Sequence, residues 1–184
     1  MIIRRSIKTS QINQFFGENR NNFYKELGML GHEGLDFSSY HGEPIYWDTN
    51  IIGEVVKIST EINEGYGMMV ITQEGNDYYQ HRFWHLKDWS VKVGQKLRTG
   101  DLIGHADNTG KSTGVHLHRD LKPLVKNYLG ILVHKYPDNG YKGAVDPMPF
   151  YQDIFIWDWI SLTKQKTSII QKLIYLYQEL IKRI

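Results

Sequence analysis

Turn-forming residues interrupt this chain at short intervals between residues 53 and 121, and the spacing leaves no room there for a long helix. Glycine, asparagine and aspartate favour tight turns, and they gather at residues 64–65, 75–77, 99–101 and 108–110. The short segments between the turns predict strands at residues 53–59, 68–72, 78–85, 102–106 and 115–121. The pattern therefore indicates a mainly β fold with closely spaced antiparallel strands.

The end of the chain differs, because its apolar residues recur at helical spacing. Ser168 fits the cap position of a capping box. A wide apolar stripe follows it, formed by Ile169, Ile170, Leu173, Ile174, Leu176, Tyr177, Leu180, Ile181 and Ile184. We predict a C-terminal amphipathic α-helix of about four turns. The chain then divides into a domain over residues 1–150 and an aromatic linker with a helical tail over residues 151–184.

The stripe is too wide to be left in water. It has to cover the domain, associate with a second copy of the chain or dock a partner. Its polar face is only modestly basic, which makes binding to a membrane surface the least favoured of the alternatives. We expect the residues after about 150 to place or assemble the protein rather than take part in its chemistry.

Composition excludes several classes of function. The chain has no cysteine, so it forms neither a disulfide nor a thiolate metal site. Its net charge of +2 is too small to indicate binding to nucleic acid. No stretch is long and apolar enough to span a membrane, and the first residues hold no apolar run of signal-peptide length.

Four of the eight histidines fall in three short segments, at residues 31–36, 83–86 and 114–118. A catalytic zinc takes three protein ligands and keeps one position open for water. His32, Asp36 and one histidine of the His116 and His118 pair would supply those ligands. The other member of the pair and His85 would be left for proton transfer and charge stabilisation.

The spacing of His32 and Asp36 predicts how the chain brings them together. In a straight strand they would lie about 13 Å apart, and the glycines at 31 and 34 argue against a helix. We expect a curved or bulged start of a strand, with Gly34 allowing the bend.

His116 and His118 are two residues apart, so on a strand they point to the same side, with Cα atoms about 6.5–7 Å apart. Val115 and Leu117 would then face the core. Each segment alone has an ordinary explanation as a turn, a buried aromatic stretch or a chance strand pair, and only their joint occurrence favours a metal site. The histidines outside the segments are expected to be structural or on the surface: His41, His81, His105 and His134.

Together the segments resemble the lysostaphin-type zinc endopeptidases, which cut peptidoglycan peptides. That family has a His-x-x-x-Asp segment, an aromatic-x-His-Leu segment and a His-x-His segment after a Thr-Gly-x-Ser-Thr-Gly run. This chain has the three patterns, in that order, at residues 32–36, 83–86 and 109–118. The likeness covers about residues 10–150, ends near Asp146-Pro147, and implies an antiparallel β-sheet lysostaphin-like peptidase domain.

The resemblance also implies the role of each residue. His32, Asp36 and His118 would bind Zn²⁺, His116 would be the general base, and His85 would hold the developing oxyanion. The implied reaction is hydrolysis of a peptide bond in a peptidoglycan stem or cross-bridge.

Two positions depart from the family pattern. Arg119 follows the last histidine where the family usually has an aromatic residue, although Asp120 keeps the usual acidic type. Val115 stands where proline is common. We expect both to affect how the substrate fits rather than the chemistry.

Two alternatives stand beside this interpretation. One is a non-catalytic cell-wall-binding or virion structural module with a structural metal site. The other is a zinc carboxypeptidase of another class, which would need a glutamate base beside a ligand histidine, and the sequence around His116 and His118 offers none. An endopeptidase without a signal peptide would reach the wall as a bacteriophage endolysin, as part of a virion or as a trimmed secreted protein.

Overall fold

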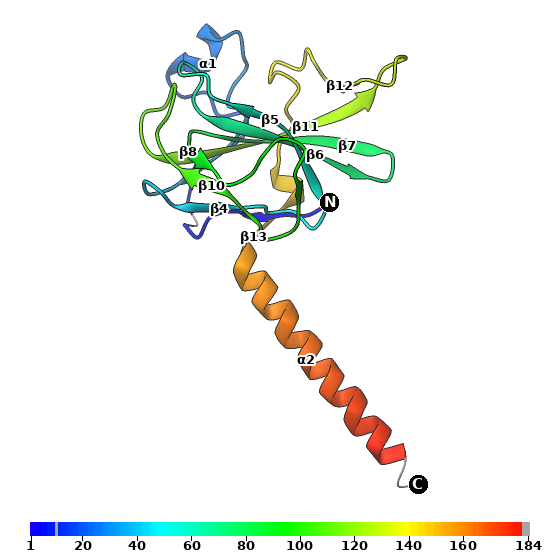
Figure 1. Cartoon of the computed structure of the whole chain (residues 1–184). Coiled ribbons are helices and arrows are strands. Elements are labelled where there is room, and N and C mark those ends of the chain that lie inside the picture. Colours follow the sequence, from blue (N-terminus) through cyan, green and yellow to red (C-terminus); the bar gives the residue numbers. More distant parts are fainter. Residues whose placement is uncertain (10, 182–184) are drawn as a thin grey trace.

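The computed structural model describes residues 1–9 and 11–181 and is built around one large sheet (Figure 1). The strand order is β2-β3-β11-β7-β6-β5-β9, and β12 also pairs with β11. Neighbouring strands of this sheet run antiparallel, as the turn pattern predicts. In chain order the strands are β2 (Ile12–Gln14), β3 (Gly34–Ser38), β5 (Gly53–Ser59), β6 (Gly67–Glu74), β7 (Asp77–Trp84), β9 (Lys96–Leu97), β11 (His116–Lys126) and β12 (Leu132–His134).

Two smaller sheets complete the β structure. Strand β10 (Leu102–Ala106) lies between β4 (Pro44–Tyr46) and β8 (Leu86–Trp89). Strand β1 (Ile3–Arg5) pairs with β13 (Tyr151–Phe155) in parallel, which departs from the antiparallel expectation. A parallel pair needs a long crossover, and the domain between the two strands supplies it. The short helical turns are η1 (Arg20–Asn22), α1 (Phe23–Glu26) and η2 (Met148–Phe150).

The predicted strands agree with those of the structure, with differences at their ends. Residues 53–59 and 102–106 coincide with β5 and β10. Strand β11 begins one residue later than expected, which leaves Val115 half-buried outside the strand rather than in the core. It also continues to Lys126, through Pro123, a residue type that usually ends a strand.

The core lies between the large sheet and the β4-β10-β8 sheet. Leu35, Phe83 and Leu117 of the large sheet belong to the same buried cluster as Ile45 and Ile103 of the small one. The alternation along β11 follows from this packing: Leu117 and Leu121 are fully buried on the core side, and the histidines occupy the other side.

Arg119 shares the core side of β11 and is 1% exposed. Its guanidinium donates hydrogen bonds to both carboxylate oxygens of Asp48, at 3.1 and 3.2 Å, and stacks over the Phe83 ring. It also lies 2.6 Å from Nδ1 of the buried His81. Losing one partner of such a buried pair costs about 3–5 kcal/mol of stability. Arg119 is therefore a core residue, and the expectation that it affects substrate fit is wrong.

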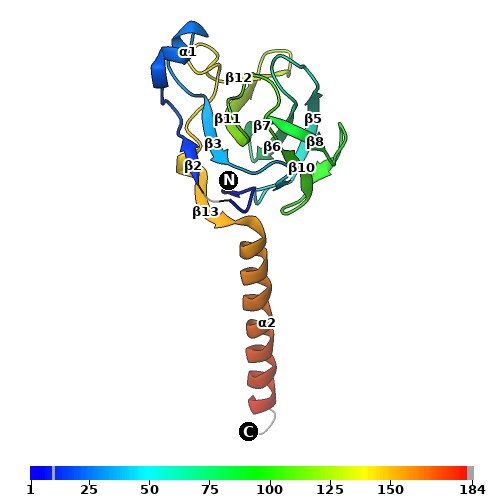
Figure 2. The same cartoon turned by 90° about the vertical axis from the view of Figure 1, so that its left-hand side faces the viewer.

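The tail is one long helix, α2 (Ile156–Ile181), that projects away from the sheets (Figures 1 and 2). The predicted cap, Ser168, lies inside this helix, so the predicted start is wrong. Residues 156–167 contain neither glycine nor proline, and nothing there ends the helix. Trp157 and Trp159, which we placed in a linker, belong to its first turns.

The first turns of α2 contact the domain. Ile156 is fully buried, and the Arg4 guanidinium lies 3.8 Å from the centre of the Trp159 ring. The stripe further along stays exposed in the single chain: Ile169, Ile170, Leu173 and Ile174 are 52–59% exposed. Ile184, the last residue of the predicted stripe, lies outside the described residues. Among the helices that are described, α2 included, none is long and apolar enough to cross a membrane.

Candidate metal centre and active site

Three of the predicted site residues meet at the junction of β3 and β11. His32 lies just before β3, Asp36 lies within it, and Asp36 is directly opposite His118 in the ladder. We expected Gly34 to allow a bend, but in the structure it allows β3 and β11 to approach each other closely. A Cβ at this position would lie 2.5 Å from the carbonyl oxygen of Arg119, so only glycine lets β3 approach β11 this closely.

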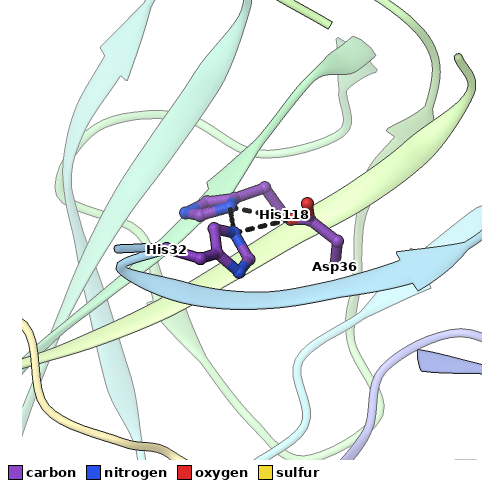
Figure 3. A group of neighbouring side chains, drawn as sticks. All are labelled: His32, Asp36 and His118. Carbon is purple, nitrogen blue, oxygen red and sulfur yellow. Dashed lines mark hydrogen bonds and ion pairs between the residues drawn. The ribbon is translucent and has the colours of Figure 1, made fainter. Parts of the chain in front are cut away.

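The potential ligand atoms of these residues converge on one point (Figure 3). His32 Nε2 lies 3.0 Å from His118 Nδ1 and 3.1 Å from Asp36 Oδ1. His118 Nδ1 lies 2.9 Å from the same carboxylate oxygen. Ligands of a tetrahedral zinc, with bonds of about 2.0–2.2 Å, are about 3.3 Å apart. Two imidazole nitrogens and one carboxylate oxygen at this spacing fit such an ion.

Hydrogen bonds to the other ring nitrogens fix which atoms face the centre. His32 Nδ1–H donates to the Phe15 carbonyl oxygen at 3.2 Å. His118 Nε2 lies 3.2 Å from Asp120 Oδ2 and donates to it. A carbonyl or an ionised carboxylate only accepts, so each outer nitrogen carries a proton, and the inner nitrogen is the one that a metal would take.

The electrostatics of the group also favour a cation at its centre. Burial would raise the pKa of Asp36, but hydrogen bonds from His118 and His32 hold it well below its usual value. Burial would lower the pKa of His118, but Asp120 and Asp36 raise it to about 9. The two carboxylates Asp36 and Asp120 thus favour positive charge at His118, and a metal ion would compete with a proton for its Nδ1.

The other two predicted residues lie beside the centre. The rings of His85 and His116 are 4.5 Å apart, and the rings of His85 and His118 are 6.2 Å apart. His116 Nε2 lies 3.7 Å from Asp36 Oδ1. The fold thus brings together all five residues that the sequence singled out.

Both outer histidines are oriented by backbone carbonyls. His85 Nδ1–H donates to Thr109 at 2.7 Å, and His116 Nδ1–H donates to Gly114 at 2.8 Å. His85 has a left-handed backbone, with φ of 63°, between β7 and β8. Burial lowers its pKa to about 4, although the Thr109 bond opposes that shift. Near neutral pH His85 is therefore uncharged, with a free lone pair on Nε2.

Three of the four remaining histidines pair with other side chains. His81 is fully buried and bonded to Thr72 and Arg119, so its role is structural. His41 pairs with Asp107, and His105 pairs with Asp88.

Sequence reasoning missed several residues around the centre. Tyr24 stacks near the His32 ring at 5.7 Å, and its pKa is raised by burial and by the nearby Asp36. Asp120 contacts His118, as described above. The signal for Asp120 was available, because positions 116, 118 and 120 share one side of a strand.

The carboxypeptidase alternative needs a glutamate beside a ligand histidine. The sequence around His118 offers none, but the fold brings Glu33 close to His118. Its carboxylate contacts Lys122 at 3.2 Å and Arg82 at 3.5 Å. Both oxygens of Glu33 are thus paired with cationic side chains. The structure therefore does not favour the carboxypeptidase alternative.

Comparison with known proteins gives relatives for this chain. The chain is 40% identical over 90 residues to the peptidoglycan DD-endopeptidase ShyA of Vibrio cholerae. The matched region covers 49% of this chain and 20% of ShyA. It is 30% identical over 126 residues to lysostaphin of Staphylococcus simulans, covering 67% of this chain and 22% of lysostaphin. The solved structure of LytU superposes with a TM-score of 0.56 and 28% identity, over 77% of this chain and 83% of that one.

The chain thus spans about a fifth of the length of these two curated relatives. Residues 30–128, more than half of the chain, match the family described as Peptidase family M23. This region contains all five predicted site residues and the strands that position them. The resemblance to lysostaphin-type peptidases is confirmed, and the chain belongs to peptidase family M23.

Proposed function

We propose that this protein is a zinc-dependent endopeptidase that hydrolyses peptide bonds in peptidoglycan stems or cross-bridges. One observation carries the proposal: potential ligand atoms of His32, Asp36 and His118 converge at about 3 Å, and the other nitrogen of each ring is hydrogen-bonded outward. The family and its peptidoglycan-cleaving members support the substrate class. His32, Asp36 and His118 would hold the metal.

When bound, zinc would polarise the scissile carbonyl and lower the pKa of a water molecule. His116 would take the proton of the attacking water, because its Nε2 faces the centre and its Nδ1–H is held by Gly114. The proton would then pass to the leaving amine. His85 would donate to the oxyanion only when Nε2 is protonated, since its Nδ1–H is already used by Thr109.

Digestion of purified peptidoglycan, analysed by mass spectrometry, tests the function. We expect new amino and carboxyl termini within the stem or cross-bridge peptides and intact glycan strands. Activity should disappear with a chelator and return with added Zn²⁺. The alternative of a non-catalytic wall-binding or virion module would be supported if the zinc-loaded protein binds the wall but releases no peptide.

We further propose that the exposed stripe of α2 mediates self-association or docks a partner. Phage release, virion association and secretion with trimming stay as predictions of how the protein reaches the wall. The association is supported by four exposed apolar side chains, those of Ile169, Ile170, Leu173 and Ile174. Burying one fully exposed side chain of this kind in an interface stabilises the complex by roughly 1.5–3 kcal/mol.

A truncation after residue 165 tests this proposal, since it keeps β13 and the turns around Trp159 that contact the domain. We expect unchanged zinc content and unchanged hydrolysis of a soluble peptide. In light scattering, the truncated chain should be monomeric while the full chain forms a larger species. Full-length Ile170→Gln/Ile174→Gln is the matched control and should also be monomeric. A monomeric full chain would contradict self-association.

A further inference from the structure

We propose that Asp120 is a positioning residue that holds His118 in the ring orientation and tautomer needed for metal binding. The inference rests on the proposed function, since it takes His118 as a metal ligand. Asp120 Oδ2 lies 3.2 Å from His118 Nε2, and the other ring nitrogen, Nδ1, faces Asp36 and His32. The imidazole is thus held at both nitrogens.

The ladder explains why Asp120 reaches the ring. His118 and Asp120 are two residues apart on β11, so their side chains lie on the same side of the strand. In the register, Asp120 is opposite Gly34 of β3 and Arg82 of β7. Gly34 has no side chain, and the room beside it is occupied by the Asp120 side chain, whose Cβ would lie 3.0 Å from an added Cβ.

Asp120 is fully buried, and a buried carboxylate needs compensating partners. Arg82 Nε lies 3.4 Å from Asp120 Oδ2, and Arg82 also contacts Glu33. Lys122 Nζ lies 3.2 Å from the second oxygen of Glu33. The negative charges of Asp120 and Glu33 are therefore balanced by the positive charges of Arg82 and Lys122 beside the proposed metal centre.

Glu33, His118 and Asp120 are close enough to suggest a second metal site. However, the cationic groups of Arg82 and Lys122 already face these carboxylates, at 3.2–3.5 Å. A second cation would meet their repulsion. The arrangement therefore favours a charge-balanced support for His118 over a second ion.

The carboxylate fixes the tautomer because it only accepts hydrogen bonds. His118 must carry its proton on Nε2 to donate to Asp120, which leaves the Nδ1 lone pair for the metal. An asparagine at this position can instead donate its amide N–H to Nε2. That would move the ring proton to Nδ1, where it blocks coordination.

The test is zinc affinity, measured by competition with a chromophoric chelator on the purified full chain. We expect Asp120→Asn to bind zinc about 10–100-fold more weakly than the wild type, the usual effect of losing such a partner. Asp120→Glu restores a carboxylate and should recover most of the affinity. Asp48→Asn is the matched control, because Asp48 is equally buried and arginine-paired but contacts the core side of β11.

Wild-type affinity in Asp120→Asn would overturn the proposal. So would an equal loss in Asp48→Asn, because the effect would then come from destabilising the fold. If circular dichroism shows that Asp120→Asn does not fold, Asp120→Glu and Asp120→Gln replace it, since they differ in charge but not in length, and equal zinc affinity in this pair overturns the proposal. A wild-type protein that binds no zinc would instead refute the proposed function itself.

Discussion

Replacing His118 by alanine is expected to abolish tight zinc binding and, with it, hydrolysis of peptidoglycan. His118 Nδ1 lies at 2.9–3.0 Å from both other ligand atoms, so its removal leaves only His32 and Asp36, fewer than the three protein ligands of catalytic zinc sites. Metal analysis of protein purified without added metal should find about one zinc per wild-type chain and almost none in the variant.

His105→Ala is the control for this experiment, because His105 pairs with Asp88 and not with the centre. It should retain its zinc. Full zinc content in His118→Ala would refute the ligand assignment. If His116→Ala loses zinc while His118→Ala keeps it, the two histidines of the pair have exchanged roles.

Alanine at His116 or at His85 is expected to lower the rate of peptide hydrolysis by about 10²–10⁴-fold while zinc stays bound. Both rings lie beside the centre, with their Nδ1–H groups tied to backbone carbonyls. The rate constant for a soluble peptide, measured together with zinc content, separates lost chemistry from lost metal. Unchanged activity in either variant would remove that residue from the mechanism.

His85→Gln tests the donor role of His85. Glutamine carries a permanent N–H donor, so it should restore part of the rate if His85 donates to the oxyanion. An equal loss in the glutamine and alanine variants would contradict the donor role. With a pKa of about 4 the ring is neutral near pH 7 and carries one proton, which the bond to Thr109 uses.

Much of the fold was predictable because the strands are short and bounded by turn residues. Residues 53–59 and 102–106 became strands as expected, and the spacing of His32 and Asp36 excluded a straight strand. The segments around His32, His85 and His118 were predictable as one site only jointly, since each is ordinary alone. Their use as ligands and acid–base groups stays a prediction.

Other features depend on partners distant in sequence. The β1–β13 pair joins the start of the chain to residues 151–155, which we expected in the linker, and no local pattern predicts this pairing. Arg119 was expected to affect substrate fit, because only the fold places it beside Asp48 and His81 in the core. The capping pattern at Ser168 predicted a helix start there, but no helix-breaking residue precedes it, and α2 begins at Ile156.

Residues of strand β11 alternate between the two sides of the sheet. Leu117 and Leu121 pack in the core on one side, and His116, His118 and Asp120 lie on the side of the proposed site. Because side chains alternate along a strand, inserting or deleting one residue between 116 and 121 would exchange these sides downstream of the change. Leucines would then face the proposed metal centre, and imidazoles or carboxylates would enter the apolar core. Length changes in this strand are therefore doubly penalised. A length change in the loop over residues 107–115 would not exchange these sides, but it would move the carbonyls of Thr109 and Gly114 that orient His85 and His116.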